Sequence, residues 1–157
     1  MSNVNTITFK YKITSPSHAL SNKHRSDATA ILGVEADFSI WCKGDRFVRI
    51  EGLTIIEFYK SVVEWLKVAH KDHPQAFHYF SVDHDESEGP ILSVVPVRGK
   101  VSMHSIWSDQ EQPLVLEQNE VMNAFILLEQ DLKKEIEQYF SIDLKAFIKH
   151  VPYRTPT

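Results

Sequence analysis

The chain has 157 residues, which one domain with a sizeable core accommodates most simply. Apolar residues make up 43% and charged residues 24%, as in an ordinary globular protein, and no apolar run is long enough to cross a membrane. The net charge of −4 is uneven: residues 1–50 hold seven basic and four acidic side chains, and residues 83–157 hold seven and thirteen. The acidic second half argues against a nucleic-acid binder and favours a protein partner with a basic surface.

Cysteine usage and the first residues of the chain bear on the compartment. The single cysteine, Cys42, has no second cysteine with which to form an internal disulfide. Residues 1–5 lack the basic region and apolar stretch of a secretion signal. Both observations predict a cytoplasmic protein.

Alternation of apolar and polar residues predicts the first strands. Register follows the apolar face, so we predict a three-residue turn that places Ile40 opposite Ile50. On the apolar face Cys42 is expected to be a small buried hydrophobe, and on the other face Arg49 is placed to stack on Trp41. The predicted strands cover residues 6–13, 34–42 and 47–50, with an aperiodic connection over 14–29.

The rest of the chain predicts two long helices separated by further strands. Thr54 and Glu57 have the spacing of a capping box, in which each side chain bonds to a free backbone N–H at the start of a helix. That helix ends before Pro74. The later elements are strands at about 76–83, 90–98 and 101–107, a helix over 119–139, and a short helix after Ser141.

The order of these elements predicts the fold class. Hairpin-length turns dominate, and there is no alternation of strand and helix that would indicate a parallel sheet. We therefore predict a single α+β domain over residues 1–157. It has an antiparallel sheet of about six strands, with two long helices and a short C-terminal helix packed on one face.

The most distinctive segment is an acidic turn between two apolar runs. Residues 77–82 and 90–95 read as strands, and the turn 83–89 between them carries four carboxylates. Exposed loops on a rigid sheet often carry recognition, so we predict a protein-binding surface here, without a metal. The predicted partner-binding residues are Asp83, Asp85, Glu86, Glu88, Trp107, Asp109 and Glu111.

An enzymatic alternative depends on the histidines. His70 and His73 share a helix face at a spacing that zinc sites use, and together with His78, His84 or His104 they would make a small histidine- or metal-dependent hydrolase. The sequence lacks a P-loop, a dinucleotide-binding glycine fingerprint, and the HExxH and GxSxG motifs. No cofactor is therefore predicted.

The layout of residues 30–150 resembles two groups of bacterial proteins. Two strands and a helix lead to an acid-tipped hairpin, then to the segment Val-Ser-Met-His-Ser-Ile-Trp-Ser at 101–108, and then to one long helix. This layout is similar to small domain-of-unknown-function proteins and to immunity proteins of polymorphic toxin systems. The second resemblance implies a non-enzymatic protein that neutralises a cognate toxin in the cytoplasm. An acidic surface would suit a basic toxin domain.

Overall fold

The computed structural model describes residues 7–69, 72–82 and 84–153 and shows an α+β fold. Seven strands and four α-helices are formed within these ranges, so the predicted fold class is confirmed. The strands are β1 (Ile7–Ile13), β2 (Glu35–Cys42), β3 (Asp45–Thr54), β4 (Phe77–Tyr79), β5 (Leu92–Val97), β6 (Lys100–His104) and β7 (Leu114–Glu117). The helices are α1 (Ala28–Leu32), α2 (Ile55–Val68), α3 (Gln118–Phe140) and α4 (Leu144–Phe147).

The strands form two antiparallel sheets where the sequence predicts one. The first sheet has the order β1-β2-β3 and the second the order β4-β5-β6-β7. A β-bridge between Val48 of β3 and Ser108 connects the first sheet to the segment that follows β6 of the second sheet. The backbone N–H of Asp109 also donates to the carbonyl of Phe47 at 2.8 Å. The segment after β6 is thus fixed to the edge of the first sheet.

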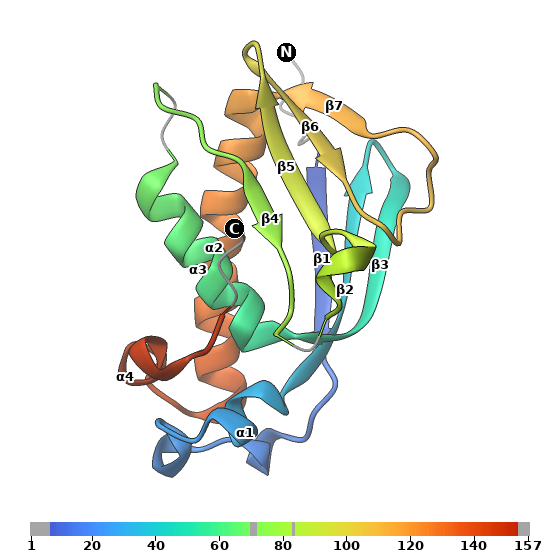
Figure 1. Cartoon of the computed structure of the whole chain (residues 1–157). Helices are drawn as coiled ribbons and strands as arrows, with labels where there is room; N and C mark the ends of the chain where they lie inside the picture. The colour runs from blue at the N-terminus through green and yellow to red at the C-terminus, as the bar shows by residue number, and fades with distance from the viewer. Residues whose placement is uncertain (1–6, 70–71, 83, 154–157) are drawn as a thin grey trace.

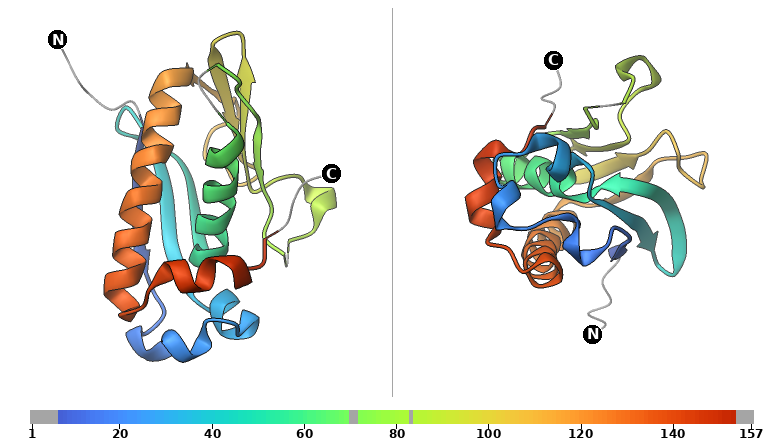
Figure 2. Two further views of the ribbon diagram at one scale, coloured as in Figure 1. Left: turned by 90° about the vertical axis from the view of Figure 1, so that its left-hand side faces the viewer. Right: turned by 90° about the horizontal axis from the view of Figure 1, so that it is seen from below.

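The two long helices lie side by side and on the same side of the sheets (Figure 1; Figure 2). Their inner faces meet the sheets in an aromatic core. Phe58 of α2 packs on Phe38, with ring centroids 5.1 Å apart. Trp65 of α2 packs at 5.2 Å from Phe77 and from Phe125 of α3. The apolar face predicted for each helix therefore points into one shared core.

The turn between β2 and β3 differs from the prediction. The chain reverses in two residues, Lys43–Gly44, which both have positive φ as a type I′ hairpin requires. A bulge then restores the pairing of apolar residues, so that Ile40 lies opposite Val48 and Phe38 lies opposite Ile50. The predicted pairing of Ile40 with Ile50 is wrong because an extra bulged residue, rather than a longer turn, aligns the apolar faces.

The predicted capping box at the start of α2 is also wrong. The Thr54 hydroxyl makes no bond to the helix backbone and donates instead to the Glu57 carboxylate at 2.7 Å. Glu57 is fully buried, and it also accepts the Tyr79 hydroxyl and the backbone N–H of Val82, each at 3.0 Å. Glu57 therefore fixes the end of β4 and the start of the loop that follows it.

Candidate partner-binding site

The acidic loop, residues 84–89, follows β4 shortly after Val82, whose backbone N–H binds Glu57. The loop forms one short turn of 3-10 helix, Glu86–Glu88. Asp85 caps this turn, because its carboxylate accepts the Ser87 backbone N–H at 2.9 Å and the Ser87 hydroxyl at 2.8 Å. Glu86 and Glu88 are exposed on the turn. The loop is thus an ordered structure that presents carboxylates to solvent.

The histidine of this loop points inward. The imidazole of His84 is 7% exposed, and its Nε2 is 2.8 Å from the carbonyl oxygen of Gly89. Its ring lies edge-on to Trp107, with centroids 5.7 Å apart and an interplanar angle of 79°. Gly89 has a φ of +93°, and a β-carbon there would lie 3.2 Å from the Cγ2 atom of Ile106. The loop therefore rests directly on the segment that follows β6.

Trp107 is held by its own turn. Its backbone N–H donates to the hydroxyl of Ser105 at 3.1 Å, and Ser105 is buried. The next residue, Ser108, accepts the backbone N–H of Gln110 at 2.9 Å. The Trp107 side chain is nevertheless 46% exposed. A large aromatic surface on a braced turn is typical of an interface anchor.

The predicted partner-binding residues differ in their surroundings in the structure. Asp109 forms an ion pair with Arg46 of β3, with 2.7 Å between Oδ2 and Nε, so its carboxylate is engaged within the chain. Asp83 lies outside the described residues. The residues that the fold gathers around the loop and the turn after β6 are Asp85, Glu86, Glu88 and Trp107, with Glu111 exposed further along that turn.

The histidines of the enzymatic alternative are distributed over the molecule. His78 and His104 flank Ser93 across the outer face of the second sheet, and His84 belongs to the acidic loop. His73 is exposed, and His70 lies outside the described residues. Within residues 7–69, 72–82 and 84–153, no three His, Cys, Asp or Glu side chains are grouped to hold a metal ion.

Sequence reasoning missed a second surface, on the outer face of the first sheet. The ammonium of Lys10 lies over the Trp41 ring, 4.2 Å from its centroid, in place of the predicted Arg49. Arg49 instead makes a two-bond pair with Asp37 and thereby lowers the pKa of that carboxyl. The signal in the sequence is a set of polar residues at alternate positions in three consecutive strands, with the small Ser39 at the centre.

Cys42 behaves as predicted. It is 8% exposed, and burial raises the pKa of its thiol. A neutral, buried thiol is a poor nucleophile. Among the residues that the structure describes, no helix is both long and apolar enough to cross a membrane.

Comparison with known proteins shows the family of the chain. It belongs to a family described as a domain of unknown function (DUF7878), whose model matches residues 9–138. This match confirms the predicted resemblance to domain-of-unknown-function proteins. Comparison with curated proteins found no match, and neither did comparison with solved structures.

Proposed function

We propose that this protein is a non-enzymatic protein-binding domain. Its partner would contact the recognition surface, which we define as the acidic loop 84–89 together with the turn 105–111. The contact between His84 and Trp107 carries the proposal, because it brings an exposed aromatic side chain beside a group of carboxylates from a distant part of the chain.

The chemistry of the recognition surface fits a basic partner. Trp107 offers apolar area at low entropic cost, as hot-spot residues of interfaces do. Glu86 and Glu88 are exposed on the loop that contacts it and Glu111 on its own turn, and these carboxylates would attract basic side chains during encounter. Trp107 would therefore supply affinity, and the carboxylates would mainly set the association rate and the choice of partner.

We further propose that the partner is a basic toxin domain and that binding takes place in the cytoplasm. The support is the predicted resemblance to immunity proteins, together with the excess of thirteen acidic over seven basic side chains in residues 83–157. A single free cysteine is consistent with a reducing compartment.

Affinity capture from the native host, followed by mass spectrometry, tests this function. Wild-type protein should retain one stoichiometric basic protein at moderate salt and release it at high salt. Trp107→Ala should lose it. Leu127→Ala, which truncates another exposed apolar side chain on α3, should retain it. Retention of the same protein by Trp107→Ala would contradict the placement of the recognition surface.

A further inference from the structure

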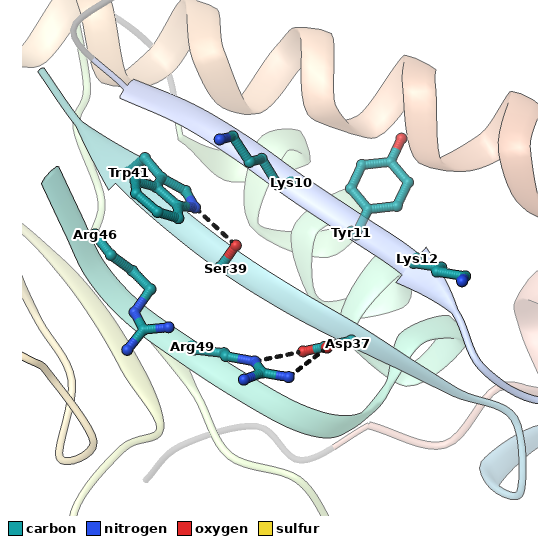
Figure 3. A pocket seen from close by; sticks show the side chains of 8 residues that line it. All are labelled: Lys10, Tyr11, Lys12, Asp37, Ser39, Trp41, Arg46 and Arg49. Carbon is teal, nitrogen blue, oxygen red and sulfur yellow. Dashed lines mark hydrogen bonds and ion pairs between the residues drawn. The ribbon is translucent and has the colours of Figure 1, made fainter. Parts of the chain in front are cut away.

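The outer face of the first sheet contains a shallow hollow of about 310 Å³ (Figure 3). It is lined by four basic side chains, one carboxylate, a serine and two aromatic rings. Its floor is Ser39 of β2, which lies opposite Lys10 of β1 on one side and Arg49 of β3 on the other. The hollow exists because a small residue occupies the central strand between two long cationic ones.

Both arginines of the hollow are oriented by acids and keep donors available. Arg49 uses Nε and Nη2 to bind Asp37, and Nη2 also contacts Glu51 at 3.2 Å. Arg46 uses Nε and Nη2 to bind Asp109. Neither Nη1 group has a partner among the described residues, and a guanidinium carries two N–H donors there. The acids thus hold each guanidinium group in place without using all of its N–H donors.

Ser39 at the floor of the hollow and Lys10 at its edge also offer groups that can bind an anion. The Ser39 hydroxyl accepts the Trp41 indole N–H at 2.9 Å, which leaves the hydroxyl hydrogen free to donate. Lys10, which lies over the Trp41 ring, brings a positive charge to the same edge. Ser39 therefore offers a hydroxyl between two strand neighbours that carry an ammonium and a guanidinium, which are the kinds of donor that bind carboxylates.

We propose that this hollow binds a short acidic segment of a protein, with one carboxylate seated over Ser39 between Lys10 and Arg49. A phosphate chain is a poorer match, because Asp37 lies in the hollow and two more acids, Glu51 and Asp109, pair with its arginines. The four basic side chains and these three carboxylates together leave the hollow with a small net positive charge, which suits one seated carboxylate better than a run of phosphates. Binding of an acidic segment at the hollow does not depend on whether the recognition surface binds a basic partner.

The test uses a fluorescein-labelled peptide with glutamates at alternate positions, and the matched peptide with glutamine in their place. Fluorescence anisotropy with the full chain at low salt should show binding of the glutamate peptide only. Lys10→Gln and Arg49→Gln should each weaken it by about threefold to tenfold, as expected for charge-assisted bonds at a partly exposed site. Lys145→Gln, an equal charge change on α4, should leave it unchanged.

A second variant separates a built site from diffuse attraction. Ser39→Val fills the floor and removes the hydroxyl without altering charge, and it should abolish binding of the glutamate peptide. Thermal unfolding of each variant serves as the control that it remains folded. Because Glu86 and Trp107 lie outside the hollow, substitutions there should leave peptide binding intact, which separates this test from that of the proposed function.

Three results would overturn the proposal. The first is equal binding of the two peptides. The second is full binding by Ser39→Val or by Lys10→Gln. The third is displacement of the peptide by a short single strand of oligothymidylate at lower concentration than by unlabelled peptide, which would assign the hollow to nucleic acid instead.

Discussion

The indole of Trp107 stands edge-on to the imidazole of His84, 5.7 Å away between ring centroids. These residues belong to different connections of the second sheet: His84 lies between β4 and β5, and Trp107 lies between β6 and β7. Their contact fixes the acidic loop against a turn that is itself attached to β3 through Val48 and Ser108. The recognition surface is therefore assembled from two segments of the chain, and the bridge to β3 holds it in place.

Gly89 should tolerate a side chain less well than Gly99 does. Both have positive φ, but Gly89 combines a φ of +93° with a ψ of 171°, a region open essentially to glycine alone, and an added β-carbon there would approach Ile106 to 3.2 Å. We expect Gly99→Ala to lower the free energy of unfolding by about 1 kcal/mol and Gly89→Ala by about 1 kcal/mol more. Urea unfolding measures both values. Equal costs would show that the loop does not rest on the 105–107 segment.

Glu57 should be among the most sensitive polar positions of the core. Glu57→Ala removes the buried carboxylate that accepts hydrogen bonds from the Thr54 hydroxyl, the Tyr79 hydroxyl and the Val82 backbone N–H. We expect the free energy of unfolding to fall by about 3 kcal/mol or more. Thr54→Val, which removes one of these donors, should cost only about 1 kcal/mol.

The control for this position is Glu135→Ala, the same change on the exposed face of α3. It should alter stability by less than about 0.5 kcal/mol. A cost for Glu57→Ala as small as that of Glu135→Ala would contradict the buried network.

Buried tyrosines should make the protein unstable at alkaline pH. Burial, reinforced by Asp131 and Glu135, raises the pKa of Tyr11 to about 12. Burial together with nearby carboxylates also raises the pKa values of Tyr59 and Tyr79 above 10. The unfolded chain releases these protons near pH ~10, so the stabilisation is complete below that pH and is lost as the pH rises toward ~12.

The measurement for the tyrosines is the free energy of unfolding in urea at about pH 9 and about pH 11. Tyr59→Phe removes one titrating group, whose hydroxyl donates to Glu129 at 3.1 Å, so the variant should lose less stability over this interval than the wild type. An equal or greater loss in the variant would show that Tyr59 is not titrated in unfolding.

Local patterns in the sequence predict most helices and strands well, because the spacing of apolar residues in these elements matches the residues that are buried. Strict alternation identifies β1 and β2, and helical spacing places the second long helix at 119–139, where α3 spans Gln118–Phe140. The missed strand β7 has only four residues, Leu114–Glu117, too few for an alternation to stand out. Such patterns do not predict how the two sheets are arranged, because that depends on the β-bridge between Val48 and Ser108, which are far apart in the sequence.

The site is harder to predict because its contacts depend on tertiary partners. The spacing of Thr54 and Glu57 is compatible with a helix cap, and the donor that draws Glu57 inward, Tyr79, lies 22 residues away. The acidic loop is evident in the sequence, but its contact with Trp107 is not. The hollow around Ser39 arises from the pairing of three strands, and no single strand indicates it.

The most direct test of the recognition surface is the association rate constant with the captured partner, measured by stopped flow over a range of salt concentrations. The double variant Glu86→Lys with Glu88→Lys should associate at least about tenfold more slowly at low salt, with a shallower salt dependence. Asp131→Lys with Glu135→Lys makes the same change of net charge on α3 and should stay close to the wild-type rate. Equal slowing by both double variants, or no slowing by the first, would contradict the placement of the recognition surface at residues 84–89 and 105–111.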